Sequence, residues 1–222
     1  MKKLENISGI PYETDVDDEF EKHPRIPNSV WNMRAMPTTS TDFEQVILTG
    51  IYGDDFIKGC KKVLEIGCGI GRNAQHFMDK TSAHYYGFDT SETSLKYFRE
   101  MGFPEDRYYI SREMDETILE QEYDFVFSTY VLNHIGFSKD NIPDDDIHDS
   151  VSIADKLWPT LKKNGYWMSF ELHQGQNKWH PDRWHKECFL DKNKSHKLLH
   201  TAQCKLDGCE PINHHLYVIQ KI

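Results

Sequence analysis

Short apolar runs alternate along the chain with longer segments whose apolar residues recur every three or four positions. The first pattern is typical of buried β-strands and the second of amphipathic helices. The apolar runs predict strands at 62–66, 83–88, 107–110, 123–128, 165–172 and 215–221. The helical spacing predicts helices at 72–80, 92–101, 145–163 and 195–202. Because strands and helices follow one another in turn, we expect a largely parallel sheet covered by helices.

The first part of the chain does not follow this alternation. Residues 1–40 mix acids, prolines and aromatic residues, which predicts an irregular arm. Residues 42–58 carry a partly helical pattern that glycines interrupt. We therefore expect an N-terminal arm and helical cap over 1–58 and one main α/β domain over 59–222.

A glycine-rich turn follows the first predicted strand. Gly67, Gly69 and Gly71 stand at alternating positions, where the backbone needs a positive φ or close approach to a ligand. The spacing is not the G-x-G-x-x-G of dinucleotide-binding proteins, because Arg72 stands where the third glycine would be. Glu65 brings a negative charge near the same turn. The pattern therefore favours a cationic ligand over a diphosphate.

This run resembles the motif E-x-G-C-G-x-G of class I S-adenosylmethionine (SAM) dependent methyltransferases. The resemblance implies a Rossmann-like three-layer α/β sandwich. Its sheet would be mostly parallel and seven-stranded, with the last strand antiparallel and inserted near the edge. In that family the glycine loop wraps the methionine and ribose parts of SAM. The resemblance thus assigns cofactor binding to Glu65, Gly67, Cys68, Gly69, Gly71 and Asn73.

Acidic residues after the second and third strands extend the resemblance. The family places its ribose-binding acid where Asp89 stands, followed by Thr90. In the structural alternative, Thr90 or Ser91 caps the next helix and Asp89 only favours the helix dipole. Met114 and Asp115 match, more loosely, the residues that flank the adenine and accept from its amine. A solvated acidic loop is the alternative for these two.

Residues 123–135 resemble the family's fourth motif, whose strand end lies beside the sulfonium. Ser128 and Tyr130 would line the cofactor there, whereas Asp124 begins the strand and is interpreted as structural. His134 is a candidate general base, because imidazole titrates near neutral pH. Packing or hydrogen bonding is the alternative role for this histidine.

Two further residues complete the candidate site. Glu171 and His173 share one face at the end of the fifth strand, so His173 is a second candidate base. Arg34 either binds the methionine carboxylate of the cofactor or forms a surface ion pair. The histidine-rich segment 173–188 has no compact pairs of ligands, so we expect no metal site.

The composition limits which partners the chain can bind and in which cellular compartment we expect it. The formal net charge of −10 argues against a broad nucleic-acid surface. Five cysteines without framework spacing indicate reduced thiols and a cytoplasmic protein. The sequence has no run of 18 apolar residues and no signal peptide at its start, so we expect no membrane association.

The sequence thus predicts methyl transfer from SAM to an oxygen or nitrogen atom of a small molecule. A natural product, a sugar or glycan precursor and a small amine all fit as acceptors. A homodimer is compatible with the chain. Two alternatives stay open: an NAD(P)-dependent oxidoreductase, which shares the fold and Asp89, and a non-catalytic SAM-binding or scaffold domain.

Overall fold

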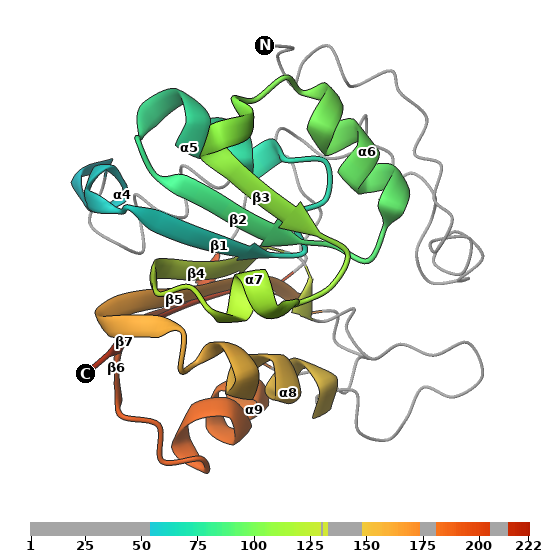
Figure 1. The fold of residues 1–222 in the computed structure, drawn as a ribbon. Coiled ribbons are helices and arrows are strands. Elements are labelled where there is room, and N and C mark those ends of the chain that lie inside the picture. Colours follow the sequence, from blue (N-terminus) through green and yellow to red (C-terminus); the bar gives the residue numbers. More distant parts are fainter. Residues whose placement is uncertain (1–53, 130, 133–147, 174–180, 205–212) are drawn as a thin grey trace, which may run out of the picture.

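The structure is a computed structural model. It describes residues 54–129, 131–132, 148–173, 181–204 and 213–222 (Figure 1). The predicted cap, 1–58, lies outside the described residues except for its last five positions. In the described part, no helix is long and apolar enough to cross a membrane.

Strands and helices alternate through the described part of the chain. The strands are β1 Lys62–Ile66, β2 His84–Phe88, β3 Tyr108–Ser111, β4 Tyr123–Thr129, β5 Leu161–His173, β6 His196–Cys204 and β7 Asn213–Lys221. The helices are α4 Asp54–Gly59, α5 Arg72–Lys80, α6 Glu92–Glu100, η2 Glu105–Arg107, α7 Glu116–Leu119, α8 His148–Leu157, α9 Pro181–His185 and η4 Lys186–Leu190.

The described strands form one seven-stranded sheet in the order β3-β2-β1-β4-β5-β7-β6. Neighbouring strands from β3 to β5 are parallel, whereas β7 pairs antiparallel with both β5 and β6. This confirms the expected sheet, with the last strand antiparallel and inserted next to the edge. Because β1 lies between β2 and β4, the strand order reverses at β1. Open α/β sheets bind ligands at the carboxyl end of such a point.

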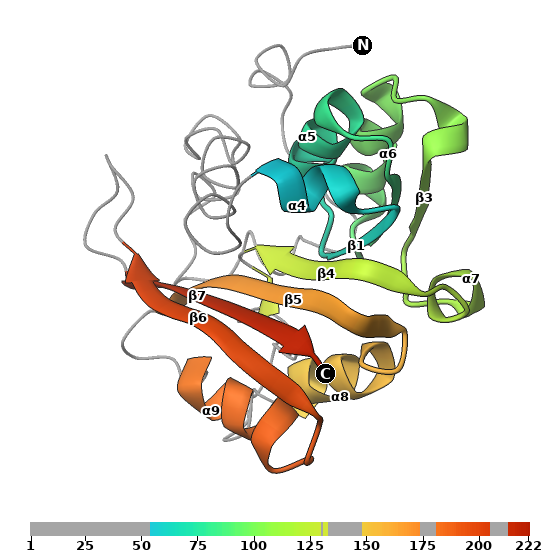
Figure 2. The ribbon, with the colours of Figure 1, turned by 90° about the vertical axis from the view of Figure 1, so that its left-hand side faces the viewer.

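Two apolar layers pack on opposite faces of the sheet. Phe77 of α5 and Phe98 of α6 belong to one buried cluster, and Leu157 of α8 and Phe189 of η4 belong to the other. Figure 2 shows α5 and α6 on one side of the sheet and α8 and α9 on the other. The chain is therefore the three-layer sandwich that the sequence predicts.

The prediction of a helix at 195–202 is wrong, because this segment is strand β6. It pairs along β7, with Leu198 opposite Ile219 and Ala202 opposite Leu216. The segment has no strict period of two, so its local pattern does not favour a strand. The backbone groups along one edge of β7 need partners, and pairing with β6 supplies them.

The predicted helix 145–163 extends too far at its end. Helix α8 ends at Leu157, and β5 already begins at Leu161. Proline has no N–H and disfavours helix in the residue before it, so Pro159 stops the helix. Thr160 then donates from its backbone N–H and its hydroxyl to the carbonyl of Leu157, at 3.1 and 2.8 Å.

Candidate active site

The glycine loop leaves the carboxyl end of β1 with three left-handed residues. Gly67, Gly69 and Gly71 have φ values of 70°, 50° and 86°. The N–H groups of Gly67 and Cys68 donate to the carbonyl oxygen of Phe88 in β2, at 2.9 and 3.1 Å. The loop therefore turns over the strand end in a backbone conformation that glycine adopts more easily than other residues.

Close packing adds a second reason for glycine in this loop. A Cβ on Gly67 would lie 2.6 Å from Val131 Cγ1 and closer still to Cγ2. A Cβ on Gly71 would lie 2.7 Å from Phe98 Cδ2. The loop thus packs between the segment after β4 and helix α6.

The side chain of Cys68 faces the protein interior. A Cβ on Gly87 of β2 would lie 2.8 Å from Cys68 Cβ, so the cysteine packs against the bare backbone of this glycine. Burial raises the pKa of the Cys68 thiol well above its usual range. The cofactor-binding role predicted for Cys68 therefore concerns its backbone.

Glu65 is a buried acid beneath the glycine loop. Its carboxyl accepts hydrogen bonds from the hydroxyl of Tyr85 and from Asn73 Nδ2, and Asn73 Nδ2 also lies 2.9 Å from Thr129 Oγ1. Burial raises the pKa of Glu65 to about 8. The sequence places a negative charge here, but the structure makes this carboxyl largely neutral at pH 7. Sequence reasoning missed Tyr85, although a glutamate inside an apolar strand signals the need for a buried partner.

The raised pKa of Glu65 predicts how stability depends on pH. Between its usual pKa of 4.5 and about 8, the folded chain holds a proton that the unfolded chain releases. The contribution of Glu65 to stability is therefore full below pH 4.5 and falls as pH rises toward 8. Its steepest slope is about 1.4 kcal/mol per pH unit.

Glu65→Gln is expected to remove this slope. Urea unfolding at several values between pH 5 and pH 8 should show a flatter stability profile for the variant than for the wild type. The matched control is Glu105→Gln, which changes an exposed glutamate in η2. Identical pH profiles for wild type and Glu65→Gln would contradict a buried, neutral Glu65.

Asp89 joins the glycine loop to helix α6. Its Oδ2 accepts from the backbone N–H of Gly69 and its Oδ1 accepts from the backbone N–H of Ser91, each at 2.9 Å. The N-cap of α6 is Ser91, whose hydroxyl accepts from the N–H of Ser94. The cap that the structural alternative assigns to Thr90 or Ser91 is thus Ser91. Asp89 binds the backbone on both sides of the turn, and its side chain stays partly exposed beside the loop. Thr90 is exposed next to it.

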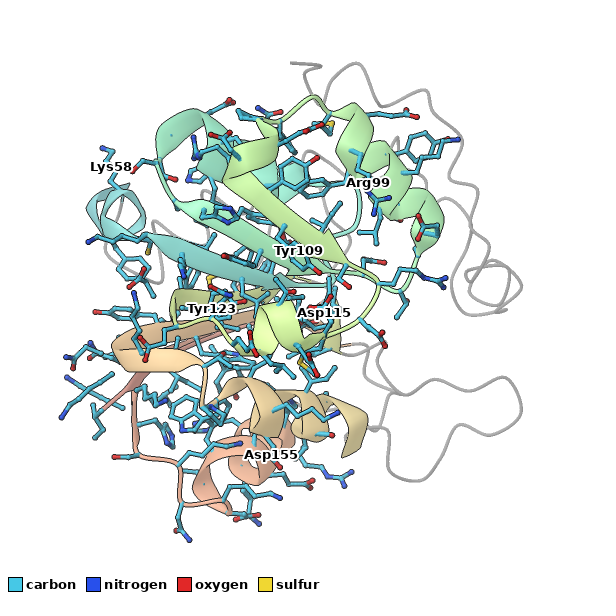
Figure 3. The ribbon with its side chains drawn as sticks, in the orientation of Figure 1. Lys58, Arg99, Tyr109, Asp115, Tyr123 and Asp155 are labelled. Carbon is cyan, nitrogen blue, oxygen red and sulfur yellow. The ribbon has the colours of Figure 1, made fainter. Side chains whose placement is uncertain are left out.

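Asp115 is more firmly engaged within the protein than the sequence suggests. Its carboxylate accepts from the hydroxyl of Tyr109 at 2.7 Å, and as the N-cap of α7 it accepts from the N–H of Ile118 (Figure 3). Burial opposes ionisation, but these hydrogen bonds outweigh it and lower the pKa of Asp115. The preceding Met114 is half-buried against the cluster that contains Leu64 and Val126.

The end of β4 is held by an acid from β5. Ser128 is buried and donates from its hydroxyl to Glu171 Oε1 at 2.7 Å. Glu171 Oε2 accepts from the backbone N–H groups of Val131 and Leu132, at 2.8 and 3.1 Å. The structure therefore brings together the ends of β4 and β5, as the sequence predicts. It directs Glu171 toward Ser128 and the backbone after it.

Several predicted residues lie where the structure does not describe them. Arg34, Tyr130 and His134 are outside the described residues, and so is the side chain of His173, which ends β5 opposite Asn213. Their predicted roles stay predictions. Among the described residues, no group of three or more His, Cys, Asp or Glu side chains is placed to hold a metal ion.

Known proteins resemble the part of the chain that contains the glycine loop. A family model described as a methyltransferase domain matches residues 63–144, which include the glycine loop and Asp89. No curated protein matches the chain in sequence.

Solved structures share the fold. The plantazolicin methyltransferase BpumL in complex with S-adenosyl-L-homocysteine (SAH) has a TM-score of 0.62 and 10% identity, over 99% of this chain and 98% of that one. The N-methyltransferase NodS from Bradyrhizobium japonicum WM9, also with SAH, has a TM-score of 0.59 and 13% identity, over 86% and 91%. A SAM-dependent methyltransferase described as putative, from Listeria monocytogenes, has a TM-score of 0.59 and 15% identity, over 83% and 99%.

These two kinds of evidence complement each other. At such low identities the solved structures show the fold alone, which is the sheet order and the three layers described above. The family model covers the segment that carries the glycine loop. Residues 63–144 therefore match a methyltransferase domain, and the fold is that of the SAM-dependent methyltransferases named above.

Proposed function

We propose that this chain transfers the methyl group of SAM to an oxygen or nitrogen atom of a small molecule. The observation that carries the proposal is the hydrogen bond between Gly69 N and Asp89 Oδ2 at the carboxyl ends of β1 and β2. It puts a partly exposed carboxylate beside a loop of left-handed glycines, at the point where the strand order reverses.

The residues present fit the cofactor. Among the described residues, a Cβ on Gly69 would meet only Asp89 Oδ2, at 4.0 Å, so the loop backbone beside this acid is open to a ligand. Asp89 has two carboxylate oxygens, which suit the two hydroxyls of a ribose. SAM supplies an electrophilic methyl group when it is bound. What the chain must supply is alignment of the acceptor and, for a hydroxyl or an ammonium group, removal of a proton.

His134 and His173 are our candidates for removing that proton. Imidazole is basic enough to accept a proton near neutral pH. His173 ends β5 two positions after Glu171, and the carboxylate of Glu171 is hydrogen-bonded at this same edge of the sheet. Single His134→Ala and His173→Ala variants would identify the base by loss of turnover at unchanged SAH affinity.

A small acceptor fits two further observations. The net charge of −10 disfavours a polyanionic substrate. The structurally similar proteins named above include an N-methyltransferase and a plantazolicin methyltransferase. The match to a methyltransferase domain favours this function over the nicotinamide-dependent alternative.

Thermal unfolding with different ligands is the first test. A ligand at 100 times its dissociation constant adds about 2.7 kcal/mol to the free energy of unfolding, which raises Tm by roughly 5–10 °C for a chain of this size. We expect this shift with SAM and SAH and none with NAD or NADP. A shift with a nicotinamide cofactor would contradict the proposal.

Transfer of the methyl group is the second test. SAM with an isotopically labelled methyl group, incubated with panels of amines, alcohols, sugars and peptides, should yield a labelled small molecule. A labelled nucleic acid, and no labelled small molecule, would contradict the acceptor class. SAH binding without turnover of any acceptor would favour the scaffold alternative.

A further inference from the structure

Glu171 is a buried acid to which the cofactor assignments above give no role. Its side chain is 1% exposed, and both carboxylate oxygens accept hydrogen bonds. One bond comes from Ser128 Oγ and two come from the backbone N–H groups of Val131 and Leu132. A buried carboxylate with three donors is costly to lose, because each donor would then be left without a partner.

The two N–H groups belong to the segment that packs on the glycine loop. The side chain of Val131 lies so close to Gly67 that a Cβ there would be 2.6 Å from its Cγ1 and 2.9 Å from its Cβ. Glu171 therefore holds the backbone of a residue whose side chain touches the first glycine of the cofactor loop. The contacts run from β5 through the segment after β4 to the turn after β1.

We propose that Glu171 is a positioning residue for the cofactor loop. It fixes the backbone of Val131, and Val131 in turn fixes the left-handed turn at Gly67, whose φ is 70°. A loop that is already ordered in its binding conformation binds more tightly, because less conformational entropy is lost on binding. Glu171 thus acts on SAM affinity through Val131 and Gly67. This inference rests on the assignment of the glycine loop to SAM.

The test compares two substitutions that differ in the hydrogen bonds they retain. Glu171→Ala removes both carboxylate oxygens and with them all three hydrogen bonds. In Glu171→Gln the amide oxygen still accepts from Val131 and Leu132, and the amide N–H group faces Ser128, whose hydroxyl turns to accept. We expect the dissociation constant of SAH, measured by calorimetry where each variant is folded, to rise roughly 10-fold or more for Glu171→Ala. Glu171→Gln should restore most of the affinity.

A matched control separates positioning from general destabilisation. Ser169 lies on the same strand and sheet face, and Ser169→Ala loses the hydrogen bond from Trp167 Nε1 at 3.0 Å. Unlike Glu171, the Ser169 side chain has no hydrogen bond to Val131 or Leu132, the two described residues after β4. Ser169→Ala should lower stability and leave SAH affinity unchanged. Hydrogen exchange should be faster at the amides of Val131 and Leu132 in Glu171→Ala and unchanged there in Ser169→Ala.

Three results would overturn the inference, and they are distinguishable. If Glu171→Ala binds SAH as the wild type does while Asp89→Ala does not, the cofactor loop is correctly assigned and Glu171 is only structural. If the wild type does not bind SAH, the cofactor assignment fails and the inference fails with it. Equal losses of affinity in Glu171→Ala and Ser169→Ala would also overturn it.

Discussion

Replacing Gly67 with alanine is expected to destabilise the chain and to abolish most of its affinity for SAH. An L-residue at φ 70° costs roughly 1–2 kcal/mol. The new Cβ would overlap the side chain of Val131, and such overpacking costs roughly 1–3 kcal/mol more. We expect the free energy of unfolding to fall by about 2–5 kcal/mol, as measured by urea titration.

Two further variants test the cause of that loss. Among the described residues, nothing lies within 4 Å of an added Cβ on Gly59, so Gly59→Ala should change stability by no more than about 0.5 kcal/mol. Adding Val131→Ala to Gly67→Ala removes the overlap with the two Cγ atoms but not the strained φ. Stability should therefore recover in part. Equal stability of Gly67→Ala and Gly59→Ala would contradict the packing described here.

The centre of the fold can be predicted because local and long-range signals agree there. The apolar run 62–66 becomes β1, and the helix expected at 72–80 is α5 with the same bounds. Glycines end the strand, and the next helix begins directly after Gly71. Segment 195–202 is different, because its strand conformation depends on pairing with β7, which follows it in the chain. A local pattern holds no information about that partner.

In the candidate site, too, some residues can be predicted from the local sequence and others depend on distant contacts. The glycines and Asp89 stand at motif spacing within about one βαβ unit, so the sequence reveals them. Asp124 is structural, as its place at the start of the strand predicts. It accepts from the N–H groups of Lys61 and Lys62 and pairs with Lys162 Nζ at 2.7 Å. The partners of buried acids were missed, because they come from distant parts of the chain.

Glu65 and Glu171 illustrate that limit. Glu65 accepts a hydrogen bond from Tyr85, twenty positions away, and Glu171 accepts one from the backbone of Val131, forty positions away. Both contacts arise only when β1, β2, β4 and β5 are ordered in the sheet. The sequence shows that each acid stands in an apolar strand and needs partners, but not which residues supply them.

Asp89→Ala is expected to weaken SAH binding about 100-fold. Two hydrogen bonds from a ribose to one carboxylate, at roughly 1.5 kcal/mol or more each, account for a loss of this size. The ligand-induced rise in Tm should fall by roughly half or more at a fixed SAH concentration that saturates the wild type. Calorimetry with SAH, below the Tm of each variant, measures the affinity directly.

Asp89→Ala also removes hydrogen bonds within the protein, because Asp89 binds two backbone N–H groups. Its bonds to Gly69 N and Ser91 N are lost together with the ribose contact, so part of the effect would come from a loosened loop. Asp89→Asn keeps part of the internal contact, because one oxygen still accepts from Ser91 N while the amide N–H group opposes Gly69 N. Its SAH affinity should therefore lie between those of the wild type and Asp89→Ala. Asp106→Ala, at an exposed acid in η2 before β3, controls for the loss of a charge. If Asp89→Ala binds SAH as tightly as Asp106→Ala does, Asp89 only joins the loop to α6, and the ribose is bound elsewhere.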